Sequence, residues 1–121
     1  MPNISLTKLC KEHGIKVLTY DAATLPQEAL AIFNIKPESR GVAIMMDGQP
    51  TILVDRGLPL DELRYTVAHE LGHILLGHLS FRDAHGTEPP QAEMEANAFA
   101  AALIAQDLIY SYGQKEATVH E

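Results

Sequence analysis

Three histidines and one glutamate lie close together in TVAHELGHILLGH, residues 66–78 of the chain. His69 and His73 are four residues apart, so on a helix both imidazoles reach toward one point and can bind a single metal ion. Glu70, beside the first histidine, can accept a proton from a water that the ion activates. The spacing His-Glu-x-x-His is the helix pattern of zinc proteases. We therefore predict that His69 and His73 bind zinc and that Glu70 is the catalytic base.

Two histidines do not complete such a site, because a catalytic zinc usually has three protein ligands and one open position. His78 does not fit the extended metzincin pattern, which requires a glycine at 76 and a histidine at 79, where this chain has Leu76 and Leu79. We expect His78 to interact instead with the C-terminal dipole of the helix. The downstream candidates for the third ligand are His85, Glu88, Glu93 and Glu95.

The histidine pair needs a helix, and residues 61–77 predict one, with Asp61 and Glu62 favourable in its first turn. At about 100° per residue, its apolar residues form one stripe that would face the core. His69 and His73 lie more than a right angle from the centre of this stripe. The stripe consists of Leu60, Leu63, Val67, Leu71 and Ile74.

A second helix is predicted over residues 91–109, which are rich in alanine and leucine. Glu93 and Glu95 lie near its start, where acidic residues are favourable even without a metal. Both faces of this helix are apolar, so helical phase does not choose between the two glutamates. His85 and Glu88 lie in a turn-rich loop, residues 80–90, where precise placement of a ligand is harder.

The upstream part of the chain predicts a small sheet. Asp47-Gly48 between two apolar runs is a strong hairpin signal, and Pro50 suggests an edge position. Long helices follow, so the fold class is α+β. The expected upstream elements are a helix at 5–13, a strand at 15–20, a helix at 25–35 and hairpin strands at 41–46 and 51–54.

The length of 121 residues predicts a single domain, which we place at 1–110, with a tail at 111–121. The net charge of −7, with nine scattered basic residues, argues against direct nucleic-acid binding. Cys10 is the only cysteine, and no apolar run is long enough to span a membrane or act as a signal peptide. We therefore expect a cytoplasmic protein.

Two segments in this order, RYTVAHELGHILLGH at 64–78 and EMEANAFAAALI at 93–104, resemble the ImmA/IrrE family of zinc metallopeptidases. The resemblance implies a minimal zincin-like domain, in which a small antiparallel sheet or hairpin packs on the histidine helix and a C-terminal Ala-rich helix. It implies that the glutamate before the Ala-Asn pair, Glu95, is the third ligand, with Glu93 as the runner-up. The chain reads LIAQDL where family members commonly have a Met-Pro pair.

The resemblance also implies a function, a zinc-dependent endopeptidase. Relatives cut helix-turn-helix repressors of mobile elements or stress regulons, so the implied partner is a transcriptional repressor as protein substrate. One alternative is a non-proteolytic, antirepressor-like regulatory module with a vestigial or structural zinc site. A closed site that recruits His78 or His85 as a fourth ligand would favour this alternative. Another alternative is a zinc hydrolase acting on small peptides or non-peptide amides.

Overall fold

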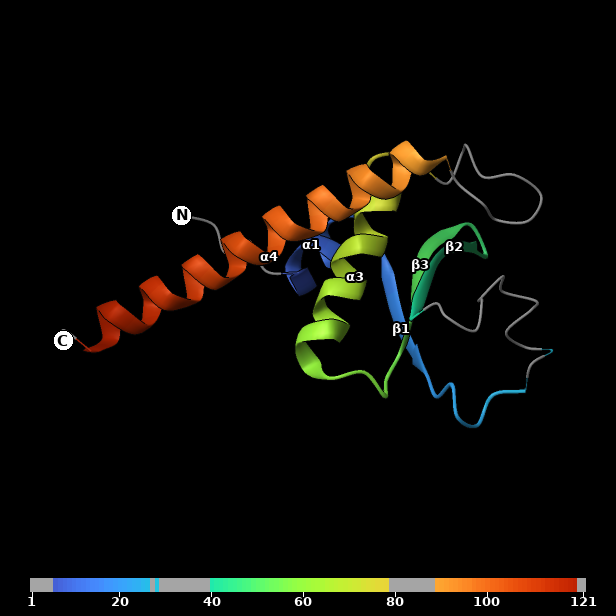
Figure 1. Ribbon diagram of the computed structural model, residues 1–121, viewed down its shortest axis with the longest axis horizontal. Helices are drawn as coiled ribbons and strands as arrows, with labels where there is room; N and C mark the ends of the chain where they lie inside the picture. Colours follow the sequence, from blue (N-terminus) through green and yellow to red (C-terminus); the bar gives the residue numbers. More distant parts are fainter. Residues whose placement is uncertain (1–5, 27, 29–39, 79–88, 120–121) are drawn as a thin grey trace.

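Three helices and three strands make up the part of the chain that the computed structural model describes, which is residues 6–26, 28, 40–78 and 89–119. Beyond residue 106 the description covers the backbone alone. In chain order the elements are α1 (Leu6–Glu12), β1 (Lys16–Tyr20), β2 (Gly41–Met46), β3 (Gln49–Asp55), α3 (Leu60–Leu75) and α4 (Pro90–Val119) (Figure 1). The α+β class is confirmed. The helix expected at 25–35 and the loop at 80–90 fall largely outside the described residues.

The hairpin predicted around Asp47-Gly48 is confirmed, with β2 antiparallel to β3. Both turn residues have a positive φ, 52° for Asp47 and 78° for Gly48, as the tight two-residue hairpin turn requires. The expected edge position of the Pro50 strand is wrong, because β3 is the central strand in the order β1-β3-β2. Pro50 is tolerated there because the pairing of β3 with β1 begins one residue later, at Thr51.

The sheet is mixed rather than purely antiparallel, because β1 pairs in parallel with β3. This pairing joins residues far apart in the sequence, Lys16 with Thr51 through Tyr20 with Asp55. As the central strand, β3 is buried from Thr51 to Val54. The sheet therefore offers α3 a mostly apolar surface. Both β2 and β3 contact this helix.

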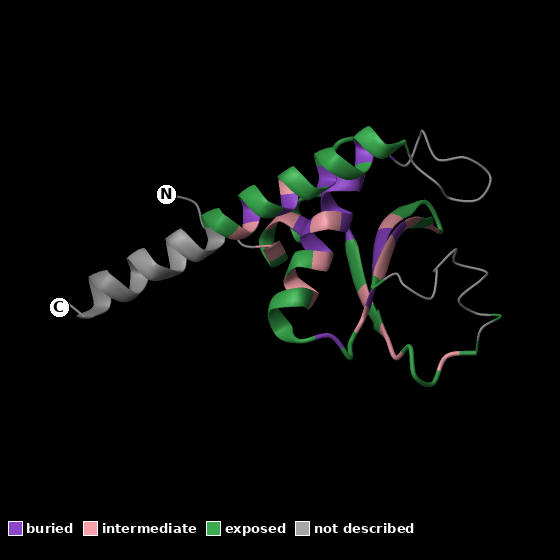
Figure 2. Cartoon of the chain, in the orientation of Figure 1, coloured by how far each residue is buried: buried purple, intermediate pink, exposed green. Residues whose placement is uncertain are grey.

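Helix α3 packs on the sheet through the predicted stripe, with one exception (Figure 2). Val67 and Leu71 are buried, and Leu63 and Ile74 pack against the same core. Leu60 was expected in the core but is 73% exposed, because it begins the helix, where no described element covers it. The free thiol of Cys10, from α1, is in this core, and burial raises its pKa.

Helix α4 crosses α3 and continues past the expected end at 109, up to Val119 (Figure 1). Residues 110–119 contain no proline, and the helix continues through Gly113 into 114–118, QKEAT, which are mostly good helix formers. The buried residues of α4 form a narrow stripe of small side chains toward α3, which consists of Ala92, Ala96, Ala100 and Leu103. None of the described helices combines the length and the apolar character that a membrane span needs.

Gly72 is a point of close approach between α3 and α4. A Cβ atom built at this position would lie 3.0 Å from Cδ1 and 3.2 Å from Cβ of Phe99. These separations are shorter than ordinary van der Waals contact, so a glycine lets Phe99 of α4 lie directly on the backbone of α3. The distance between the two helices, and with it the position of every side chain they share, depends on this contact.

We expect Gly72→Ala to lower the free energy of unfolding by about 1 kcal/mol. Overpacking against Phe99 costs about 1–3 kcal/mol, which exceeds the gain of about 1 kcal/mol in helix propensity. Urea denaturation of the variant measures the difference. In a double-mutant cycle, Gly72→Ala should become stabilising once Phe99→Ala has removed the ring. A stabilising Gly72→Ala in the presence of Phe99 would show that the contact is loose.

Candidate metal centre

His69 and His73 lie one turn apart on α3, and their rings converge as the spacing predicts. The two Nε2 atoms are 3.0 Å apart, and the rings meet edge to face at a centroid distance of 4.6 Å. His73 is almost fully buried, at 2% exposure, because α4 covers this side of α3. His69 is partly open, with 15% of its side chain exposed. The pair therefore presents two nitrogen atoms to one point at the border between core and solvent.

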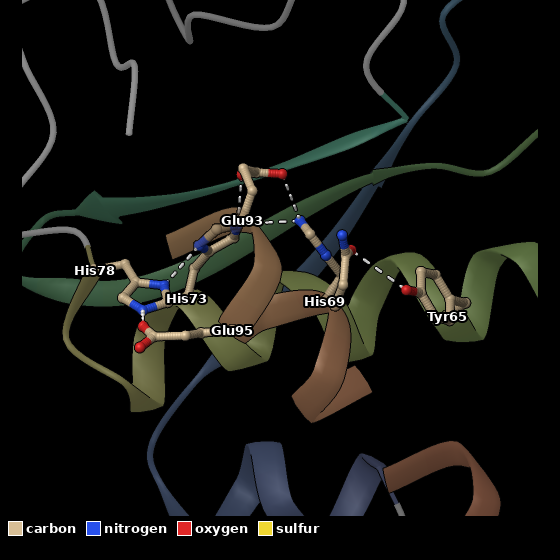
Figure 3. A network of polar contacts seen from close by, with 7 residues as sticks. Tyr65, His69, His73, His78, Glu93 and Glu95 are labelled. Atoms are coloured by element: carbon tan, nitrogen blue, oxygen red, sulfur yellow. Dashed lines mark hydrogen bonds and ion pairs between the residues drawn. The ribbon is translucent and has the colours of Figure 1, made fainter. Parts of the chain in front are cut away.

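Glu93, in the first turn of α4, supplies an oxygen atom to each of these nitrogens (Figure 3). Its Oε1 lies 3.0 Å from Nε2 of His73, and its Oε2 lies 3.4 Å from Nε2 of His69. Among the described residues, His69, His73 and Glu93 form a group that could hold a metal ion, with one possible ligand atom from each within 4.8 Å of the others.

The donor set and its spacing fit zinc. Two imidazole nitrogens and a carboxylate are the ligands of several catalytic zinc sites. Ligand atoms bound at 2.0–2.2 Å to a tetrahedral ion lie about 3.3–3.6 Å from one another, close to the 3.0–3.4 Å between these side chains. The Glu93 side chain is 54% exposed, so the group is open to solvent on one side. An open side is the mark of a catalytic site rather than a closed structural one.

Glu95, the third ligand that the resemblance implies, lies elsewhere. Its Oε1 is 2.8 Å from Nε2 of His78, and its Oε2 accepts a hydrogen bond from the Gln91 amide at 3.3 Å. The structure thus brings the runner-up, Glu93, to the two histidines and brings Glu95 to the third histidine. His85 and Glu88 lie outside the described residues.

His78 is buried behind His73, on the side away from Glu93 (Figure 3). The Nδ1 atoms of the two rings are 2.9 Å apart. Its neighbour Gly77 has a φ of 76°, and this left-handed residue turns the chain back just after the end of α3. The contact of His78 with His73 was missed at the level of sequence, where we expected an interaction with the helix dipole or, in the alternative interpretation, a fourth metal ligand. The sequence signal that could have indicated this contact is a glycine at the end of the helix, followed directly by a histidine.

Glu70 is buried, with 8% of its surface exposed. Its charge acts on Tyr20, at the end of β1. Burial, together with the negative charges of Asp55 and Glu70, raises the pKa of the Tyr20 hydroxyl, so this group is neutral at physiological pH. The hydroxyl is buried and has no hydrogen-bond partner among the described residues. Tyr20 is a neighbour of the predicted base that no sequence motif indicates.

On the other side of His69, Tyr65 stacks on the imidazole at a centroid distance of 6.4 Å, and its hydroxyl donates a hydrogen bond to Oδ1 of Asn97 at 3.3 Å. Asn97 lies one turn after Glu93 on α4. Tyr65 also lines an open pocket of about 440 Å³, whose other walls are Arg40, Asp61, Glu62 and Thr66. Tyr65 thus lies between this pocket and His69, and the pocket is large enough for a side chain of a bound peptide.

Comparison with known families matches residues 10–107 to the model described as IrrE N-terminal-like domain, a peptidase family. The match covers most of the chain and includes α3 and the first turns of α4, which carry the histidines and both glutamates. Searches among curated proteins and solved structures found no significant match.

The two glutamates of α4 make a matched pair for a test of the ligand set. We expect Glu93→Gln to weaken zinc binding more than about 100-fold, because loss of a ligand should exceed the 10–100-fold typical of residues that only support a ligand. Glu95→Gln should weaken it less. Chelator competition measures both dissociation constants. A larger loss of zinc affinity in Glu95→Gln than in Glu93→Gln would instead identify Glu95 as the ligand.

Proposed function

The chain belongs to the ImmA/IrrE family of metallopeptidases, and we propose that it is a zinc-dependent endopeptidase with His69, His73 and Glu93 as metal ligands. The observation that carries this proposal is the convergence of two histidine nitrogens and a carboxylate from two helices on one partly open point. Family membership supports zinc as the metal. Glu95 is not proposed as a ligand, because its carboxylate is engaged by His78 and Gln91.

Bound by these residues, zinc would act as a Lewis acid on the scissile carbonyl and would lower the pKa of a water molecule. Glu70 accepts a proton from the attacking water and passes it to the nitrogen of the leaving amine. Its position next to His69 on the same helix supports this role.

The open pocket beside Tyr65 supports a peptide as substrate. Two acidic residues and one arginine form its charged walls, and Arg40 is 3.7 Å from Glu62. The excess of negative charge favours a basic side chain in the substrate next to the cleaved bond. The pocket is open to solvent, which suits a segment of a protein chain better than a small enclosed ligand.

We propose a helix-turn-helix repressor of a mobile element or stress regulon as the substrate, in the cytoplasm. The resemblance to the ImmA/IrrE family implies this class of partner. The net charge of −7 supports a role in cutting the repressor rather than in binding its DNA directly. We also propose that residues 1–110 act as a single catalytic unit.

A non-proteolytic module with a closed zinc site is less well supported. Such a site needs a fourth protein ligand, and none joins His69, His73 and Glu93 within the described part of the chain. His78 was one of the two residues considered for this role. It contacts the opposite nitrogen of His73 instead.

We expect Glu70→Gln to retain zinc and to lower the rate of repressor cleavage by about 10²–10⁴-fold, the usual contribution of a general base. Incubation with a purified repressor, followed by gel analysis, measures cleavage, and elemental analysis measures bound zinc. Glu12→Gln, an exposed glutamate on α1, serves as the control and should cleave normally. A chelator should abolish cleavage by the wild-type protein. Normal cleavage by Glu70→Gln would assign the base to another residue.

A further inference from the structure

A chain of hydrogen bonds leads away from the metal-binding group on the side opposite to Glu93 (Figure 3). It begins at Nδ1 of His73, passes through the ring of His78, and ends at Oε1 of Glu95. The two links are short, 2.9 Å and 2.8 Å. His73 and His78 are both buried, so water does not compete for these bonds.

The carboxylate at the end of this chain favours a proton on one particular nitrogen of His78. A carboxylate only accepts hydrogen bonds, so Nε2 of His78 carries a proton and donates it to Glu95. Nδ1 of a neutral His78 then has a free lone pair and accepts the proton from Nδ1 of His73. A neutral His73 that donates from Nδ1 has a lone pair on Nε2, the atom that faces His69 and Glu93. Without a metal, the Glu93 carboxylate at 3.0 Å favours a proton on this Nε2, so the contact with His78 acts against that preference.

The opposite arrangement of protons would prevent metal binding. If Nδ1 of His78 carried the proton, its Nε2 lone pair would face the lone pairs of the Glu95 carboxylate at 2.8 Å. His73 would then accept at Nδ1 and hold its own proton on Nε2, the atom that the metal needs. The ionised carboxylate disfavours this arrangement.

We propose that Glu95 and His78 are positioning residues, which hold His73 in the tautomer and orientation that metal binding at its Nε2 requires. This inference rests on the proposed metal site and adds two residues to it. A metal-bound histidine commonly donates its second N–H to a carboxylate or carbonyl, which also makes the ligand nitrogen more basic. Here the carboxylate acts through a second imidazole.

One further observation supports a fixed relay rather than a chance contact, and another limits the relay to His73. Gln91 holds the other oxygen of Glu95, which restricts rotation of the carboxylate. His69 has no comparable support, because its Nδ1 is buried without a hydrogen-bond partner among the described residues. The relay therefore acts on one ligand only, the more deeply buried of the two.

Substitutions of His78 separate hydrogen bonding from packing. His78→Leu fills a similar space without an acceptor, whereas His78→Asn can keep an acceptor oxygen close to the position of Nδ1. We expect His78→Leu to weaken zinc binding about 10–100-fold and His78→Asn to restore most of the affinity. Glu95→Gln, at a position that is about half exposed and tolerant of change, should weaken binding by about tenfold. Chelator competition on the full chain gives the dissociation constants, and thermal unfolding shows that each variant is folded.

Nitrogen NMR of the histidine rings in the full chain without added metal provides a readout that does not depend on zinc. In a Glu93→Ala background, where no carboxylate faces Nε2, we expect the His73 proton on Nδ1 and a shift of the population toward Nε2 when His78→Leu is added. Unchanged zinc affinity in His78→Leu, or equal losses in the leucine and asparagine variants, would overturn the proposal. A wild-type protein that binds no zinc would instead contradict the proposed function, and the His73 tautomer would still test the relay.

Discussion

The close packing of α4 across α3 is the constraint on which the site depends. The two histidines come from α3, and the carboxylate that completes their group comes from α4. The distances between these side chains therefore depend on how closely the two helices approach and on which face of α4 is turned toward α3. Gly72 lies directly before His73 and receives Phe99 of α4 on its backbone. A larger residue at this point would move Glu93 away from both imidazoles, although it would not touch any of the three side chains.

The phase of α4 explains why its two glutamates have different partners. At about 100° per residue, the buried stripe of α4 has Ala96 near its centre. Glu93 then lies about 60° to one side of this centre, and Glu95 lies about 100° to the other side. The stripe faces α3, so the two carboxylates reach α3 on opposite flanks. One meets His69 and His73, and the other meets His78.

Local patterns could be predicted from the sequence because they depend on neighbours along the chain. The i, i+4 spacing of His69 and His73, the apolar stripe of their helix and the Asp47-Gly48 turn are of this kind, and the structure contains each of them. The choice between Glu93 and Glu95 depended on which face of an Ala-rich helix is buried. Both faces are apolar in sequence, so only the tertiary packing makes the choice. The parallel pairing of β1 with β3 also depends on contacts between residues far apart in the sequence. This pairing makes β3 the central strand, so Pro50 does not lie in an edge strand.

The segment Glu93-Met94-Glu95 acts on a single imidazole from both sides. Glu93 contacts the Nε2 of His73 directly, and Glu95 acts on its Nδ1 through His78. A buried histidine ligand should be neutral, so the charge that balances a divalent cation has to come from carboxylates near it. Glu93 supplies one negative charge in contact with the ligand nitrogens, and Glu95 supplies a second one beyond them. Because both glutamates belong to one turn of α4, a single helix–helix contact positions Glu93, the third ligand that we propose, and Glu95, the carboxylate that we propose to orient His73.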